Sequence, residues 1–249
     1  MKGIIPADIG TMLNDLGLSI SALKWEEIQR SPELADFTPE QLLREILEPQ
    51  HMEIINQRYK TNLRLSSLLN KDALIDRLVT GNGRRYNDQT VSQLKSFCFA
   101  EDRLNVGVYG VTGAGKSYFM SAFCNEACRL NYRCKYVDYC DLMDELLTLS
   151  RSQDLARYTK RLKYYARIQI LFLDDFAISR YSEDGIKILY HLIKTRSDLG
   201  KSTMFTTQYA PNEWGEHLSD EKGCYGKLDG IRRRLTTGFT VTIEKSTGS

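Results

Sequence analysis

The residues with the clearest chemical meaning lie at 110–117, where the chain reads Gly-Val-Thr-Gly-Ala-Gly-Lys-Ser. This spacing fits the pattern G-x-x-x-x-G-K-[ST] at every fixed position. Glycines in such a loop let successive backbone N–H groups point at phosphate oxygens, and the helix that follows adds the positive end of its dipole. We therefore predict that the loop binds ATP, with Lys116 on the β- and γ-phosphates and the Ser117 hydroxyl on Mg²⁺. The predicted nucleotide contacts are Gly110, Val111, Thr112, Gly113, Ala114, Gly115, Lys116, Ser117 and Tyr118.

A pair of acids follows an apolar run downstream, in Ile-Leu-Phe-Leu-Asp-Asp at 170–175. The run is typical of a buried strand, and ligands of open α/β sheets bind at the carboxyl ends of strands. We predict that Asp174 holds the Mg²⁺ and its water shell, and that Asp175 orients and polarises the water that attacks ATP. A plain turn after a strand is the structural alternative.

The elements that must position these residues alternate between strands and helices from residue 103 onward. This alternation predicts an α/β fold, with a parallel five-stranded sheet between helices. The expected strands are 105–109, 134–139, 168–173, 202–208 and 239–243, and the expected helices are 116–130, 141–167 and 183–199.

The first 75 residues instead have apolar residues at helical spacing. Thr38-Pro39-Glu40-Gln41 has the composition of a capped helix start. We expect a small helical domain over 1–75, a connector over 76–102 with a helix at about 88–100, and an ATPase domain over 103–249.

Composition and charge narrow the class of protein. Of the 249 residues 42% are hydrophobic and 27% are charged, as in ordinary soluble proteins. No apolar run approaches the roughly 20 residues that span a bilayer, and no signal-peptide core follows Met1, so we expect a cytoplasmic protein without membrane contact.

Residues 1–53 carry ten acids and four bases, a net −6, so the remainder must carry +8 to give the total of +2. An acidic head on a basic body predicts two different partners.

Together these features resemble the AAA+ family of P-loop ATPases, and within it the branch of the helicase loader DnaC and the transposition helper ATPase IstB. The resemblance covers nearly the whole chain. It depends on the double Asp at 174–175, on the segment Met-Phe-Thr-Thr-Gln-Tyr-Ala-Pro-Asn-Glu-Trp at 204–214, and on a short end after 228–235 with one strand and no C-terminal lid. The acidic head, with Leu43, Glu48, Glu53 and Arg58, looks more like the transposition helper.

The resemblance implies two further site residues. Gln208 stands where the family has a polar sensor residue that contacts the γ-phosphate or the attacking water. Arg234 stands where the family has its arginine finger, which completes the site of a neighbouring subunit and requires a homo-oligomer, a ring or a spiral. Arg232 or Arg233 could be the finger instead.

A basic stretch at 151–167 holds six basic side chains and one acid. On a helical wheel Leu155, Tyr158 and Leu162 share one arc with Tyr165 and Ala166, and the basic residues lie opposite. A basic face with a tyrosine on it is suited to a phosphate backbone, although many charged faces are merely solvated. The resemblance also implies a DNA-lining helix here. The predicted DNA contacts are Arg157, Lys160, Arg161, Lys163, Tyr164 and Arg167.

These observations predict an ATP-dependent helper of a transposase that assembles on double-stranded DNA, with the helical head on the transposase and with ATP hydrolysis releasing or remodelling the complex. Because Asp175 stands where most relatives have Glu, we expect slow turnover that DNA or a partner stimulates. The alternative is a DnaC-like loader of a replicative helicase. A small-molecule kinase would need an acceptor pocket and a lid, for which the sequence offers no evidence.

Overall fold

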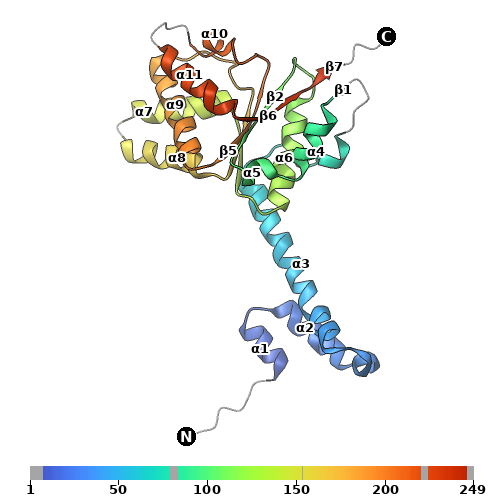
Figure 1. Cartoon of the computed structure of the whole chain (residues 1–249). Coiled ribbons are helices and arrows are strands. Elements are labelled where there is room, and N and C mark those ends of the chain that lie inside the picture. The colour runs from blue at the N-terminus through green and yellow to red at the C-terminus, as the bar shows by residue number, and fades with distance from the viewer. Residues whose placement is uncertain (1–7, 79–83, 153, 220–223, 246–249) are drawn as a thin grey trace. The chain divides into compact units, whose positions relative to one another are not determined.

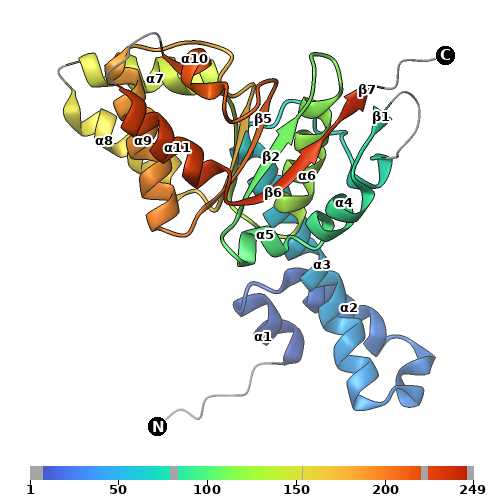
Figure 2. The ribbon, with the colours of Figure 1, turned by 45° about the horizontal axis from the view of Figure 1, so that its top comes forward.

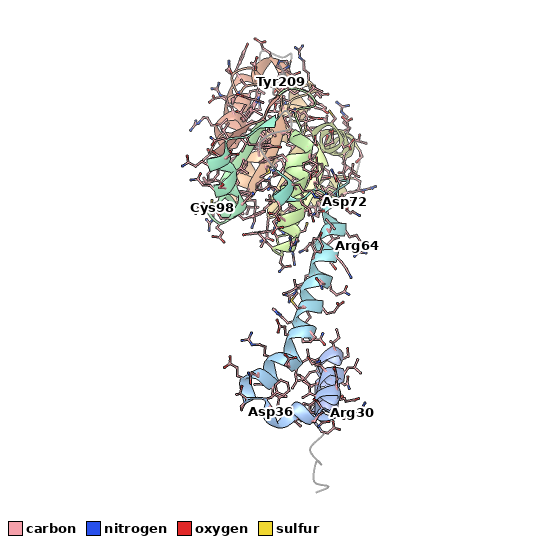
Figure 3. The ribbon with its side chains drawn as sticks, turned by 90° about the vertical axis from the view of Figure 1, so that its right-hand side faces the viewer. Arg30, Asp36, Arg64, Asp72, Cys98 and Tyr209 are labelled. Atoms are coloured by element: carbon pink, nitrogen blue, oxygen red, sulfur yellow. The ribbon has the colours of Figure 1, made fainter. Side chains whose placement is uncertain are left out.

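The computed structural model describes residues 8–78, 84–152, 154–219 and 224–245 (Figure 1). The chain divides into two compact units, Met1–Lys60 and Thr61–Ser249. In Figure 3, Arg30 and Asp36 belong to the first unit, and Asp72, Cys98 and Tyr209 belong to the second. None of the described helices has the length and apolar character needed to cross a membrane.

The first unit is helical. Its described elements are α1 Ile9–Asp15, α2 Ser19–Gln29, the 3₁₀ helix Pro32–Asp36 and the part of α3 Pro39–Ser66 that ends at Lys60. The predicted start of α3 is confirmed by a reciprocal cap: Gln41 N donates to Thr38 Oγ1 at 3.3 Å, and Thr38 N donates to Gln41 Oε1 at 2.9 Å. Ala22, Ile28 and Ile46 are buried in this unit.

The boundary between the units lies inside α3, and not near residue 75 as we expected. The side-chain amide of Asn125 donates to the carbonyls of Lys71 (2.9 Å) and Ala73 (3.0 Å). These bonds join the segment after α3 to the sheet-bearing unit, which therefore begins at Thr61. A helical pattern in the sequence does not reveal which unit a helix packs on.

The second unit is built on a parallel sheet with the strand order β3-β4-β5-β2-β6. The expected fold class is confirmed, and each strand lies within two residues of its predicted ends. Strands β4 and β5 are buried along their whole length because they lie in the middle of the sheet. The five strands are β2 Asn105–Tyr109, β3 Cys134–Asp138, β4 Ile170–Asp174, β5 Ser202–Thr207 and β6 Gly238–Thr242.

Helices cover both faces of this sheet (Figures 1 and 2). One face carries α4 Asp88–Lys95, α5 Cys98–Glu101 and α6 Lys116–Arg129. The other face is covered by a helical layer whose apolar residues form one core cluster with β4 and β5. This layer consists of α7 Tyr139–Arg151, α8 Leu155–Arg167, α9 Glu183–Asp198, α10 Trp214–Leu218 and α11 Tyr225–Leu235. After β6 the described residues form only the short strand β7 Glu244–Lys245, which pairs with β1 Arg84–Arg85, so no lid follows in the described part.

Two predicted helices are each divided into two. The stretch at 88–100 breaks at Phe97, whose backbone is left-handed (φ 58°). The stretch at 141–167 breaks after Arg151: Ser152 is extended, and the Asp154 carboxylate caps α8 by accepting from Arg157 N at 2.9 Å. Short polar side chains compete for backbone groups and so end and restart helices. Residues 79–83, inside the expected connector, and residue 153 lie outside the described part of the chain.

Candidate nucleotide site and basic surface

The conformation of the loop between β2 and α6 requires glycine at three positions, 110, 113 and 115. Gly113 and Gly115 have φ values of 75° and 99°, which side chains rarely tolerate. A Cβ on Gly110 would lie 2.6 Å from the carbonyl oxygen of Ile243, which follows β6. The first glycine of the motif is therefore required by a strand that joins the sheet from the far end of the sequence.

Lys116 begins α6 and closes the loop on itself. Its Nζ donates to the carbonyls of Gly110 (2.9 Å) and Val111 (3.2 Å), and the residue is only 5% exposed. Burial lowers the pKa of Lys116, and the carboxylates of Asp175 and Asp174 act in the opposite direction. The loop thus carries a desolvated ammonium group that faces two carboxylates.

Asp174 ends β4 and is held by hydroxyl groups on both sides. Tyr136 on β3 donates to its Oδ2, and Thr206 on β5 donates to its Oδ1. Ser117 Oγ also donates to Oδ1 at 3.3 Å. A hydroxyl beside a carboxylate fits the all-oxygen ligand set that Mg²⁺ prefers.

Asp175 turns away from the strand in a left-handed conformation (φ 51°). Its backbone N–H donates to Thr206 Oγ1 (2.9 Å) and Asp174 Oδ1 (3.1 Å), which holds this strained turn in place. Burial raises the pKa of Asp175, and so does the charge of Asp174; Lys116 opposes the shift. Because of this turn the two neighbouring carboxylates have different surroundings.

Lys116, Ser117 and Asp175 line one cavity of about 460 Å³, and Asp174 lies behind it, in contact with Ser117. Gln208, just after β5, closes one side, where Thr112 Oγ1 donates to its Oε1 at 2.8 Å. Three of the predicted nucleotide contacts, Gly110, Val111 and Ala114, do not line the cavity: Val111 is exposed and Ala114 is buried beneath the loop. The lining residues are Thr112, Gly113, Gly115, Lys116, Ser117, Tyr118, Asp175, Ile178 and Gln208.

Three residues that the sequence did not single out belong to this region. Tyr136 and Thr206 orient Asp174, and Ile178 lines the cavity. A hydroxyl near the end of each strand beside β4 is the signal that would identify the first two. That signal can be read only once the strand order is known.

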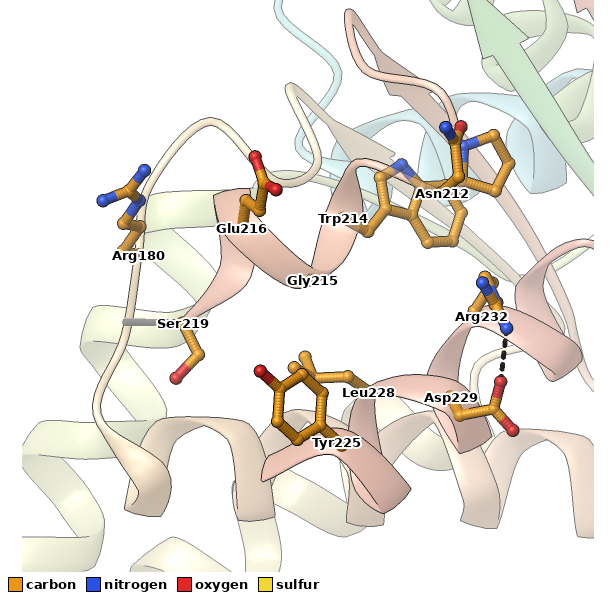
Figure 4. Close-up of a pocket in the computed structure, with 11 residues that line it drawn as sticks. Arg180, Asn212, Trp214, Gly215, Glu216, Ser219, Tyr225, Leu228, Asp229 and Arg232 are labelled. Atoms are coloured by element: carbon orange, nitrogen blue, oxygen red, sulfur yellow. Dashed lines mark hydrogen bonds and ion pairs between the residues drawn. The ribbon is translucent and has the colours of Figure 1, made fainter. Parts of the chain in front are cut away.

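The basic run of α11 does not reach this cavity. Arg234 Nη1 donates to Gly230 O at 2.9 Å, and its guanidinium lies 5.5 Å from the centre of the Tyr190 ring. Arg233 is exposed, and within the described residues its side chain forms no ion pair. Arg232 pairs with Asp229 at 2.6 Å, on the border of a second cavity of about 690 Å³ between α10 and α11 (Figure 4).

The basic residues of α8 are not equivalent. Arg157, Lys160, Lys163 and Arg167 are exposed, and we call these four the α8 basic surface. Arg161 instead turns toward α7, where its Nε and Nη2 donate to the two carboxylate oxygens of Glu145 at 2.5 and 2.8 Å.

Arg161 is therefore paired with an acid and only partly exposed, unlike the other basic residues of the predicted face, and its contact with DNA stays a prediction. A helical wheel places side chains by angle alone, and it omits the acid that a neighbouring helix presents. Tyr164 is half-buried beside Arg161, and Leu155, expected on the buried arc, is 68% exposed at the first turn of α8.

Comparisons of the sequence with known proteins relate this chain to ATP-binding proteins of insertion sequences. A family model described as IstB-like ATP binding protein matches residues 11–236. A Sinorhizobium fredii protein, named as an insertion sequence ATP-binding protein, is 24% identical over 88% of this chain and 86% of its own. A Pseudomonas fluorescens protein, named as an ATP-binding protein of insertion sequence IS1162, is 27% identical over 55% of this chain and 57% of its own. The chain thus spans most of the first relative and little more than half of the second.

Solved structures share the fold. The crystal structure of DnaI matches with a TM-score of 0.57 and 21% identity, over 74% of this chain and 93% of DnaI. The crystal structure of the DnaC helicase loader matches with a TM-score of 0.52 and 20% identity, over 68% of this chain and 97% of the loader. At these identities the likeness concerns the fold alone.

Proposed function

Because this chain belongs to the IstB-like ATP-binding protein family, we propose that it is a Mg²⁺-dependent ATPase that assembles on double-stranded DNA and assists a transposase. The observation that carries the proposal is the cavity that joins Lys116, Asp175 and Gln208 to the phosphate loop. The relatives named for insertion sequences support a role in transposition, which is a form of DNA recombination.

The chemistry of the cavity is phosphoryl transfer to water. Backbone amides of the loop and Lys116 bind the phosphates of ATP. Ser117 and Asp174 would hold the Mg²⁺, which would neutralise charge on the phosphate oxygens. Asp175 accepts a hydrogen bond from the attacking water, and Gln208 contacts the γ-phosphate or that water. As Asp175 is shorter than the usual Glu, turnover is slow until DNA or a partner stimulates it.

The α8 basic surface is the proposed DNA contact. Its four cations are exposed, and none of them forms an ion pair within the part of the chain that the structure describes. Such cations displace the counterions of DNA and gain affinity at low salt. Tyr164 contributes at the edge of this surface, whereas Arg161 orients α8 through Glu145.

The helical region predicted over residues 1–75 is the proposed contact for the transposase, and the first unit, Met1–Lys60, is the part of it outside the sheet-bearing unit. Its first 53 residues carry a net −6. Leu43 and Leu47 are exposed on α3 and border a hollow of about 400 Å³, which is also lined by Glu40, Glu48, Arg44 and His51. Exposed apolar residues among acids suit a basic, amphipathic segment of a partner.

A helicase loader is the second candidate, favoured by the likeness of the fold to DnaI and DnaC. Pull-down of the full-length protein with a transposase and with a replicative helicase separates the two candidates. Capture of the helicase alone would favour the loader.

The nucleotide proposal is tested with fluorescent ATP and phosphate release. We expect Lys116→Ala to lower ATP affinity at least tenfold, because the buried ammonium contacts the phosphates. We expect Asp175→Asn to bind ATP and Mg²⁺ normally but to lose at least 100-fold in turnover. Lys135→Ala, on β3 and outside the cavity, is the control. Wild-type turnover in Asp175→Asn would contradict the assignment of the base.

A further inference from the structure

A hollow of about 800 Å³ lies beside the α8 basic surface and plays no part in the proposed nucleotide chemistry. One stripe of α8 forms its first wall, the last turns of α3 form its second wall, and the residues at the start of β3 and before β4 form its base. The side-chain amide of Asn62 on α3 donates to Asn131 Oδ1 at 3.1 Å and ties the second wall to the loop before β3. The lining residues are Thr61, Asn62, Leu65, Arg133, Cys134, Ala156, Thr159, Lys160, Lys163, Tyr164, Arg167 and Ile168.

The lining combines apolar surface with positive charge. Leu65, Ala156 and Ile168 supply apolar surface, and Thr159 supplies a hydroxyl. Four exposed cations border the hollow, namely Arg133, Lys160, Lys163 and Arg167, and none of the described residues that line it is acidic. Within the described residues none of these cations has an ion-pair partner. The ligand that fits is therefore a flat, largely apolar group attached to more than one negative charge.

The hollow is also lined by an aromatic ring, that of Tyr164, which is packed against neighbouring side chains. The Tyr164 ring lies 4.9 Å from the Arg161 guanidinium carbon and 5.3 Å from the Tyr165 ring centre, and Arg161 is itself fixed on Glu145. A ring whose position is already set loses little conformational entropy when a ligand stacks on it. Base–aromatic stacking is independent of sequence, since every base has a π-face.

We propose that this hollow accepts one unpaired nucleobase of the DNA that lies on the α8 basic surface, with its flanking phosphates on the cations at the rim. The proposal rests on the proposed DNA-binding function, because Lys160, Lys163 and Arg167 belong to both the surface and the hollow. DNA bound along the surface therefore passes over the opening. The volume lies within the 300–1,000 Å³ typical of small-ligand pockets and accommodates a base with its sugar.

The proposal predicts a preference among DNA molecules of equal charge. Extruding a base from an intact duplex costs unstacking and unpairing, whereas a bulged base is already free. We expect the protein to bind a duplex with a one-base bulge about tenfold more tightly than a fully paired duplex. An abasic bulge of the same length should bind like the paired duplex, because it has the same flexibility but no base to insert.

The test uses the full-length protein with a non-hydrolysable ATP analogue and the fluorescence anisotropy of labelled duplexes. Ala156→Trp fills the hollow without changing its charge and should abolish the bulge preference, with the affinity for paired duplex unchanged. Leu155→Trp is the matched control: it adds the same ring one residue earlier, at an exposed position that does not line the hollow. This control should keep the preference.

Each contrary outcome has a separate meaning. Equal affinities for bulged and paired duplex, tight binding of the abasic bulge, or a preference that persists in Ala156→Trp would overturn the base site and leave the DNA-binding proposal standing. No binding of any duplex would overturn both. Binding to anionic lipid vesicles that Ala156→Trp abolishes, without any bulge preference, would assign the hollow to a lipid headgroup and reject the base.

Discussion

At the scale of single residues, Asp174 and Asp175 illustrate how adjacent carboxylates acquire different roles. Asp174 accepts hydrogen bonds from Tyr136, Thr206 and Ser117 and so has a fixed orientation. The Asp175 carboxylate receives no side-chain hydrogen bond within the described residues, and it lines the cavity. A fixed carboxylate suits a metal, and a less constrained one suits a proton acceptor.

The raised pKa of Asp175 leads to a pH prediction. Burial and the charge of Asp174 move this pKa above the ordinary 3.8. The base acts only when deprotonated, so kcat/KM for ATP hydrolysis should be constant at high pH and fall as pH drops through the raised value. Fluorescent-ATP binding over the same range separates loss of affinity from loss of catalysis. An acid limb at or below the ordinary aspartate value would contradict the prediction.

At the scale of elements, the contact between α7 and α8 determines which basic residues face solvent. The Glu145 carboxylate accepts from Arg161 and from the Tyr165 hydroxyl (2.7 Å), and Arg161 Nη2 also lies 2.8 Å from that hydroxyl. Burial alone would raise the pKa of Glu145, but the hydrogen bonds from Arg161 and Tyr165 outweigh burial and lower it. Because the folded pKa is lowered, this contribution to stability is present above the unfolded value and is lost as the pH falls through the folded one.

Separate replacement of Arg161 and Lys160 tests this division of roles. Arg161→Ala should lower the free energy of unfolding by about 1 kcal/mol, since the pair is bidentate but partly solvated. Lys160→Ala should leave stability unchanged and reduce DNA affinity several-fold at low salt, with a smaller salt dependence. Urea denaturation and DNA titrations at several salt concentrations measure both. If Arg161→Ala weakened DNA binding as much as Lys160→Ala and left stability intact, Arg161 would be a DNA contact.

At the scale of the whole molecule, the cavity beside the phosphate loop lacks a group that the proposed phosphoryl transfer would use. Among the described residues no arginine lines it, although phosphoryl transfer gains from a guanidinium on the developing charge. Arg234 is held by Gly230 and Tyr190, and Arg233 is exposed. The family resemblance implies Arg234 as the finger that completes the site of a neighbouring copy, with Arg232 or Arg233 as the alternative.

Mixing two inactive variants tests this assembly. Lys116→Ala should lose ATP binding but keep Arg234. Arg234→Ala should lose the arginine finger but keep ATP binding. We expect each alone to lack turnover and a mixture to recover a measurable fraction of wild-type phosphate release, because hybrid assemblies contain complete sites. Repetition with Arg232→Ala and with Arg233→Ala shows which arginine acts, since only the variant of the finger is both inactive alone and rescued in the mixture. Full activity of Arg234→Ala alone would exclude Arg234.

The residues at 113–117 were predictable as a phosphate loop because their geometry is local: the positive φ values of Gly113 and Gly115 and the start of a helix depend on neighbouring residues, whereas the close approach of Ile243 to Gly110 does not. The alternation of strands and helices and the cap at Thr38 are local in the same sense. By contrast, the pairing of Arg161 with Glu145, the hydroxyls around Asp174 and the boundary at Thr61 join segments far apart in the sequence. Only the tertiary structure decides such contacts, because they depend on the strand order and on the face that each helix presents. The sequence by itself therefore determined that the chain holds a nucleotide loop, and the packing decided which side chains complete the site and which remain exposed.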